Sequence, residues 1–184
     1  KKKKKKKKKK KEKKKKRKDQ LKKSKTTPQG LYLTALEAYE KVKKSPDSTL
    51  FVDVRSQLEL EFVGWTPMVD MNIPYWVKSL SSFNSKKKQY RFVPNSDFLL
   101  AISEALEDKD LDKSSTIILL CRSGNRSAYA ATLMYKAGYK NVYTVIDGFE
   151  GDKNANKERL VNGWKNSKLP WSYKLDEDKA YIAF

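Results

Sequence analysis

The chain contains no histidine and a single cysteine, Cys121, among its 184 residues. A zinc site of the usual Cys/His type cannot be built from this set, and neither can a Ser-His-Asp or a Cys-His catalytic arrangement. One cysteine also excludes an intrachain disulfide, so the cysteine content does not fix the redox compartment. Any chemistry at Cys121 must therefore proceed without an imidazole base.

Long apolar runs are also missing from the sequence. No stretch approaches the roughly 18 apolar residues that a membrane-spanning helix needs, so the sequence predicts no transmembrane helix and no membrane partner. The lysine-rich beginning of the chain lacks the apolar segment of a complete signal peptide.

The net charge of +20 is distributed very unevenly. Residues 1–25 hold 20 basic and two acidic side chains, whereas the rest of the chain holds 22 basic and 20 acidic ones. We therefore predict a disordered lysine-rich tail and linker over residues 1–27, followed by one domain over residues 28–184. The tail has no aromatic residue and a single arginine, so we predict no specific nucleic-acid partner, with binding of polyanions through counterion release as an alternative.

In the rest of the chain, apolar runs typical of buried strands alternate with segments typical of amphipathic helices. Strands are predicted at residues 31–33, 49–54, 72–75, 116–120 and 141–146. Helices are predicted at residues 35–44, 58–62, 95–108 and 127–136, the first with a capping box of Thr34 and Glu37. Residues 78–94 are polar and basic and predict a surface insertion. This order indicates an α/β fold with a mostly parallel sheet covered by helices on both faces.

The single cysteine begins the loop Cys-Arg-Ser-Gly-Asn-Arg-Ser, which joins the predicted strand 116–120 to the following helix. Ligands of parallel sheets bind beyond the carboxyl ends of the strands. The start of a helix, Gly124 and the cations Arg122 and Arg126 would favour a thiolate at Cys121 and would bind an oxyanion. Without an imidazole, sulfur transfer, thiol redox exchange and phosphoryl transfer remain as chemistries. The alternative, a structural buried thiol, does not explain two neighbouring arginines.

Several motifs together resemble the rhodanese domain over residues 30–175. They are the cysteine loop, Asp53-Val54-Arg55, Asn72-Ile73-Pro74, residues 147–151, Asn162-Gly163-Trp164 and Leu169-Pro170. The resemblance, which is strongest to bacterial single-domain members, implies a five-stranded, mostly parallel sheet with helices on both faces. It also implies sulfurtransferase activity. Several such members are exported, which favours a bacterial periplasm, with the cytoplasm as the alternative.

The resemblance also implies the roles of individual residues. Cys121 would be the nucleophile that becomes a persulfide, without metal or cofactor. Thiosulfate or a similar small anion would donate sulfur, and a thiol or cyanide would accept it; a sulfur-relay protein is a further class of partner. A persulfide carrier without turnover, or an anion-sensing module, is the alternative. The residues implied to bind substrate are Arg122, Ser123, Gly124, Asn125 and Arg126. Because a carboxylate at the end of a buried strand usually orients a neighbouring loop, Asp53 is predicted to support the cysteine loop with Arg55 as its partner, and a purely structural salt bridge between the two is the alternative. Ser127 is also predicted to support the loop.

Two details qualify this resemblance. Related phosphatases carry a Cys-x5-Arg loop, whereas here the spacing from Cys121 to Arg126 is Cys-x4-Arg and Ser127 stands where the longer loop needs arginine, which disfavours phosphatase activity. Trp65 occupies a position where many relatives have histidine. We predict that Trp65 is a packing residue, and that Trp164 and Trp171 are core aromatics.

Overall fold

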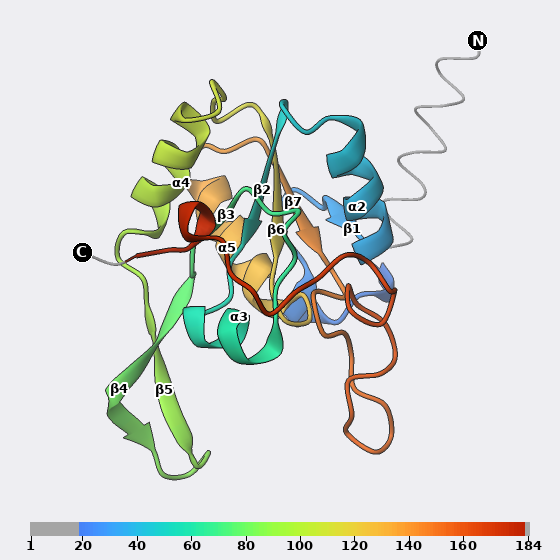
Figure 1. Cartoon of the computed structure of the whole chain (residues 1–184), viewed down its shortest axis with the longest axis vertical. Coiled ribbons are helices and arrows are strands. Elements are labelled where there is room, and N and C mark those ends of the chain that lie inside the picture. The colour runs from blue at the N-terminus through green and yellow to red at the C-terminus, as the bar shows by residue number, and fades with distance from the viewer. Residues whose placement is uncertain (1–18, 183–184) are drawn as a thin grey trace.

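Five parallel strands form the central sheet, in the order β1-β7-β6-β2-β3 (Figure 1). The computed structural model describes residues 19–182. All neighbouring pairs in this sheet are parallel, which confirms the predicted fold class. The strands are β1 (Tyr32–Leu33), β2 (Thr49–Asp53), β3 (Met71–Asn72), β6 (Thr116–Leu120) and β7 (Asn141–Val145).

Helices cover both faces of the sheet because side chains of the central strands alternate between the two faces. Leu50 and Val52 of β2 belong to a core with α4 (Phe98–Glu107) and α5 (Asn125–Lys136). Phe51 belongs to a second core with α2 (Ala35–Lys44) and α3 (Gln57–Val63). β2 and β6 pair in parallel with Asp53 opposite Leu120, so the carboxyl ends of these two strands lie side by side.

Capping boxes fix the starts of two helices. Thr34 and Glu37 form the predicted box at the start of α2. Ser56 and Glu59 form a second one at the start of α3, which the sequence analysis did not identify. The start of α5, Asn125, lies two residues before the predicted one, so the helix begins directly after Gly124.

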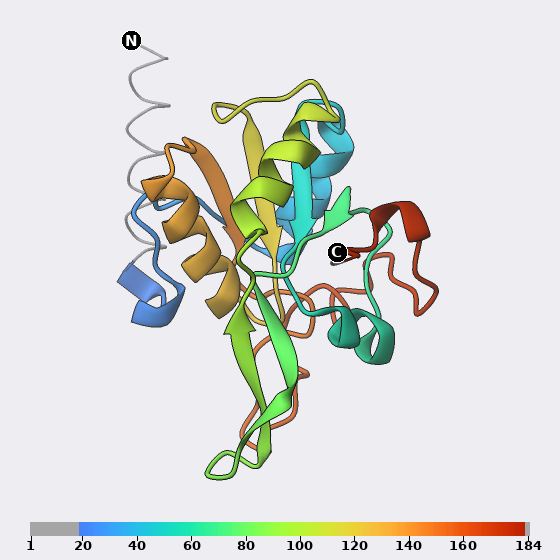
Figure 2. The ribbon, with the colours of Figure 1, turned by 90° about the vertical axis from the view of Figure 1, so that its left-hand side faces the viewer.

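An antiparallel hairpin extends from the side of the sheet at which the parallel strands end (Figures 1 and 2). It consists of β4 (Trp76–Asn84) and β5 (Gln89–Pro94), which pair only with each other among the described strands. The sequence analysis predicted a surface insertion at residues 78–94 without assigning it strands. Charged and hydroxyl side chains interrupt the apolar alternation of this segment, which hides its strand character.

The described part of the predicted tail and linker packs against the domain, contrary to the predicted disorder of these residues. It contains the 3-10 turn η1 (Lys23–Lys25), and the Lys25 ammonium is buried and donates to Ile146 O and to Asp152 Oδ1, both at 2.8 Å. Thr27 is buried and its N–H donates to Tyr32 Oη. The packed region therefore begins before residue 28, because the buried Lys25 side chain is held by Ile146 O and by the partly exposed Asp152. The prediction for residues 1–18 lies outside the described residues.

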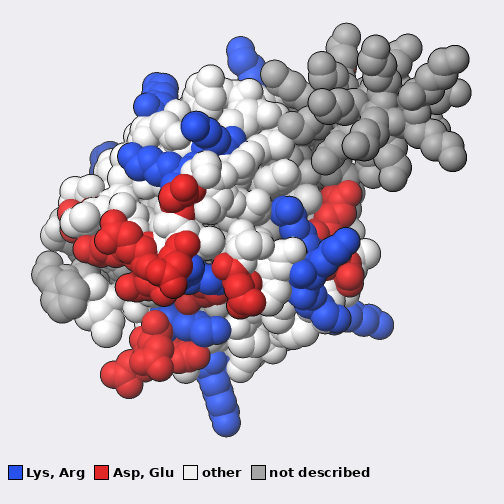
Figure 3. Space-filling model, turned by 90° about the horizontal axis from the view of Figure 1, so that it is seen from above, with Lys and Arg blue, Asp and Glu red and all other residues white. Residues whose placement is uncertain are grey.

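Charges of both signs occupy the end of the molecule opposite the hairpin. Figure 3 shows acidic side chains gathered where α4 and the turn after it lie, with lysines beside them. The exposed acids of this region are Glu104, Glu107, Asp108, Asp110 and Asp112. Within residues 19–182, no helix is both long and apolar enough to cross a membrane.

The predictions for the tryptophans hold in two of three cases. Trp65 is 2 % exposed and donates from Nε1 to Lys174 O, so it joins the C-terminal segment to the domain. Trp164 is fully buried against Phe51. The prediction for Trp171 is wrong: it is 37 % exposed, since it packs at the surface between Phe149 and Tyr173.

Candidate active site

Cys121 directly follows the last residue of β6, Leu120, at the carboxyl end of that strand. Its carbonyl accepts from Phe149 N at 2.8 Å, and the carbonyl of Arg122 accepts from Glu150 N at 3.0 Å. Gly148 lies so close that an added Cβ would be 2.5 Å from Cys121 O and from the backbone of Arg122. Residues 147–151 therefore support the cysteine loop through backbone contacts.

The sulfur of Cys121 faces the amino end of α5. Gly124 N–H donates to Sγ at 3.1 Å, and Sγ lies 3.5 Å from Ser127 Oγ, which in turn donates to Gly124 O. Gly124 has a φ of 93°, a left-handed conformation that glycine adopts readily, and an added Cβ would collide with Ile146 O. The loop thus directs an amide donor and the positive end of a helix at the sulfur, an arrangement that stabilises an anion there.

Arg126 is engaged by a carboxylate that the sequence analysis did not identify. Its Nη1 and Nη2 donate to Glu59 Oε2 and Oε1 at 2.6 and 2.5 Å, and the arginine is only 8 % exposed. Burial acts to raise the pKa of Glu59, but the hydrogen bonds and charge of Arg126, with help from Arg55 and Ser56, lower it to about 2. The sequence analysis predicted Arg126 as a cation of the loop without a partner residue, and the structure shows that Glu59 balances its charge.

The pair makes stability depend on pH in a defined window. Because the folded state lowers the pKa of Glu59 to about 2, its contribution is complete above the unfolded-state pKa of about 4.5 and is lost as pH falls toward 2. We expect Glu59→Gln to lower the free energy of unfolding by about 3 kcal/mol at pH 7, and by about half of that at pH 3. Urea unfolding of both proteins at the two pH values measures this difference.

Glu61 on the same helix provides the matched control, because it is exposed. Glu61→Gln should change the free energy of unfolding by less than about 0.5 kcal/mol at either pH. An equal loss for Glu59→Gln at pH 7 and pH 3 would contradict the ion pair as the source of its stabilisation.

Arg122 is the arginine of the loop whose charge remains accessible. Its side chain is 49 % exposed, and its Nε lies 4.0 Å from Glu150 Oε2. Ser123 and Asn125 line the same cavity as Arg122, and Ser24 Oγ donates to Asn125 Oδ1 at 3.3 Å. Arg122 is therefore the loop cation best placed to meet an incoming anion.

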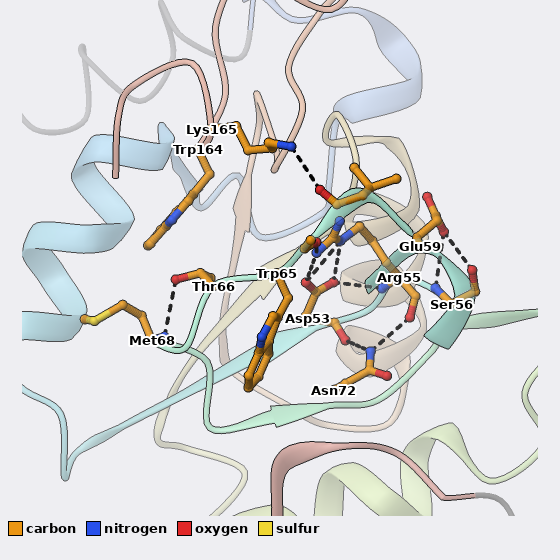
Figure 4. A network of polar contacts seen from close by, with 12 residues as sticks. Asp53, Arg55, Ser56, Glu59, Trp65, Thr66, Met68, Asn72, Trp164 and Lys165 are labelled. Carbon is orange, nitrogen blue, oxygen red and sulfur yellow. Dashed lines mark hydrogen bonds and ion pairs between the residues drawn. The ribbon is translucent and has the colours of Figure 1, made fainter. Parts of the chain in front are cut away.

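Asp53 and Arg55 form a fully buried ion pair (Figure 4). Arg55 Nη2 donates to Asp53 Oδ2 at 2.7 Å and to Gly64 O at 2.9 Å, and Asn72 Nδ2 donates to the carbonyls of both residues of the pair. The Arg55 guanidinium carbon lies 4.0 Å from the centroid of the Phe149 ring. The pair therefore reaches the cysteine loop through Phe149, whose N–H holds Cys121 O, and does not contact Sγ in the described structure.

The loop opens into a cavity of about 480 Å³. The loop lines it with Cys121, Arg122, Ser123, Asn125 and Arg126, and α3 lines it with Glu59. The hairpin supplies the remaining wall, through Trp76, Lys78, Lys87, Gln89 and Phe92. Although Cys121 is only 1 % exposed, this cavity gives its sulfur a route to ligands.

The structure brings the predicted substrate-binding residues of the loop together around the sulfur or the cavity. Ser127 contacts the sulfur itself, whereas Asp53 and Arg55 form a separate buried ion pair. Sequence reasoning missed Glu59 and the hairpin wall. The spacing Ser56-x-x-Glu59 was a detectable capping signal, but it carried no information on the pairing with Arg126, which comes from a distant segment.

Comparison with known proteins adds independent information. Residues 34–155 match the family model described as rhodanese-like domain. An uncharacterized protein of Rickettsia prowazekii is 36% identical over 127 residues, which are 69% of this chain and 85% of that protein. A thiosulfate sulfurtransferase of Haemophilus influenzae is 39% identical over 59 residues, 32% of this chain and 56% of that one. A crystal structure from M. tuberculosis superposes with a TM-score of 0.58 at 30% identity, over 78% of this chain and 97% of that one.

Proposed function

Because the chain belongs to the rhodanese-like domain family, we propose that it is a sulfurtransferase that carries sulfane sulfur as a persulfide on Cys121. The observation that carries the proposal is the Gly124 N–H at 3.1 Å from Sγ, at the amino end of α5. This donor stabilises a thiolate before the reaction and an anionic persulfide after it. The match to a thiosulfate sulfurtransferase of Haemophilus influenzae supports the same assignment.

In the first half-reaction, the Cys121 thiolate attacks the outer sulfur of thiosulfate or a similar donor. The new bond joins Sγ to that sulfur, the bond between the two donor sulfurs breaks, and its electron pair leaves with sulfite. No proton has to move, which suits a chain without histidine. Arg122, exposed at the cavity floor, is positioned to stabilise the departing anion.

In the second half-reaction, a thiophilic acceptor such as cyanide or a thiolate attacks the outer sulfur of the persulfide. The electron pair of the broken S–S bond returns to Sγ, and Cys121 is a thiolate again. Within the loop, the Gly124 amide and the α5 amino end stabilise that leaving thiolate. Oxidation states balance over the cycle without an external oxidant or reductant.

Mass spectrometry of the intact protein tests the proposal directly. After incubation with thiosulfate and removal of excess donor, we expect a gain of one sulfur atom per chain, which cyanide then removes as thiocyanate. An unchanged mass, measured before any reductant is added, would contradict the proposed persulfide.

A persulfide carrier or anion-sensing module is the second candidate, because a loop that stabilises a persulfide on Cys121 does not determine how fast the sulfur is passed to an acceptor. Steady-state formation of thiocyanate compared with a single loading cycle separates the two. Many turnovers per chain indicate an enzyme, whereas one sulfur released per chain, with slow reloading, indicates a carrier.

A further inference from the structure

The cavity above Cys121 is much larger than a small inorganic anion requires. Its volume of about 480 Å³ lies within the range of roughly 300–1,000 Å³ of sites that enclose organic ligands. One water molecule in the liquid occupies about 30 Å³, so thiosulfate would leave most of this space to solvent. The hairpin contributes five of the residues that line this cavity: Trp76, Lys78, Lys87, Gln89 and Phe92.

The hairpin wall combines aromatic rings with cations. Two cations lie near the Phe92 ring: Lys78 Nζ is 3.8 Å from the ring centroid, and the Arg126 guanidinium carbon is 5.4 Å from the same centroid. The Trp76 ring packs beside the Phe92 ring, with centroids 6.4 Å apart. It also packs against the ring of Tyr129 on α5, with centroids 5.5 Å apart. Trp76 and Phe92 thus pack against neighbouring side chains and also line the cavity.

The cavity is strongly cationic. Lys78, Lys87, Arg122 and Arg126 line it with one carboxylate, Glu59, and that carboxylate is paired with Arg126. Burial lowers the pKa of Lys78, and the charges of Arg126 and Arg122 lower it further against the opposing effect of Glu59. An anion that enters the cavity relieves this repulsion among like charges.

We infer that the site selects an anionic organic sulfur donor, whose terminal sulfur reaches Cys121 while its carbon group lies against Trp76 and Phe92. This inference rests on the proposed sulfurtransferase function and names its substrate class. The Cys121 thiolate attacks the terminal sulfur and forms the persulfide bond. The bond between that sulfur and the remainder of the donor breaks, and its electron pair leaves with the organic anion.

Two organic thiosulfonates isolate the contribution of the carbon group. Methanethiosulfonate and benzenethiosulfonate carry the same charge and both release a sulfinate, so they differ mainly in the size of the group that meets the wall. We expect the second-order rate of Cys121 persulfide formation to be at least about tenfold higher with the benzene compound. Trp76→Ala should reduce this ratio to below about threefold.

Phe83→Ala is the matched control, because Phe83 lies on the same hairpin but packs against Tyr90 outside the cavity lining. Phe83→Ala should keep the same ratio of loading rates between the two thiosulfonates as the unmodified protein. Because both rates in a ratio are measured on the same variant, a lower amount of active protein does not affect the ratio. Lys87→Gln and Lys86→Gln provide a second pair, since Lys87 lines the cavity and its neighbour Lys86 does not. Lys87→Gln should slow loading by both thiosulfonates about threefold or more at low salt, and Lys86→Gln by clearly less.

The outcomes separate this inference from the proposed function. Loading from thiosulfate with equal rates for the two thiosulfonates overturns the selection of an organic donor and leaves the sulfurtransferase standing. A ratio that Trp76→Ala does not change overturns the role of the hairpin wall. Failure of every donor to load Cys121 overturns both proposals.

Discussion

Cys121→Ser is expected to abolish persulfide formation from thiosulfate and to reduce thiocyanate production to the uncatalysed rate. Serine keeps the shape of the side chain but lacks a sulfur that can attack and later leave as a stable anion. Loss of a covalent nucleophile lowers turnover by roughly 10⁴-fold or more. The measurements are the intact mass after thiosulfate and the initial rate of thiocyanate formation.

Because Cys121 is the only cysteine, no other thiol can substitute for it in the assay. Its side chain is 1 % exposed beside Ser127, so the serine hydroxyl retains a polar neighbour, and we expect a change in unfolding free energy below about 1.5 kcal/mol. A Cys121→Ser protein that is folded and still gains sulfur would refute the assignment of the nucleophile.

Gly148→Ala is expected to damage both stability and persulfide formation, although residue 148 does not reach the cavity. Its φ is 65°, and its new Cβ would be 2.5 Å from Cys121 O, Arg122 C and Ser123 N, so backbone atoms of the cysteine loop must move. Overpacking and the left-handed backbone together predict a loss of about 2–5 kcal/mol in the free energy of unfolding. At a saturating thiosulfate concentration, the loading rate of the remaining folded protein should fall more than about tenfold.

Gly138→Ala separates strain from collision. Gly138 also has a positive φ, 91°, but no atom lies within 4 Å of its added Cβ. This variant should lose only about 1–2 kcal/mol and should load sulfur at the normal rate. Equal effects of the two substitutions on the loading rate would show that contact between Gly148 and the loop does not position Cys121.

The order of strands and helices could be predicted because each central strand is a short, continuous apolar run. β2 and β6 are buried on both faces, so their sequences contain almost no polar residue before their ends. The hairpin escaped prediction because it lies outside both cores, where no burial pattern marks its strands. Lys25 escaped for a related reason: a run of lysines indicates disorder, and only the fold brings Asp152 to it.

The residues of the site that are contiguous in the sequence, those of the cysteine loop, could be predicted. Glu59, which is distant in the sequence and contacts the loop only in the folded protein, could not. The cysteine loop could be identified from local spacing, since strand, glycine and helix start lie within a few residues. The charge state of that loop could not, because Glu59 reaches Arg126 from α3. The distance between these residues in the chain, 67 positions, leaves no periodic pattern in the sequence that would link them.

The topology of the hairpin has an evolutionary consequence. Its two ends meet at the base, where Asn95 N–H donates to Tyr75 O at 3.1 Å, and its strands share no register with the five-stranded sheet. An excursion whose ends already adjoin can be lengthened, shortened or exchanged at little cost to the remaining fold. The hairpin wall of the cavity can therefore diversify between lineages, or be grafted by protein engineers, while the segments that hold Cys121 stay unchanged.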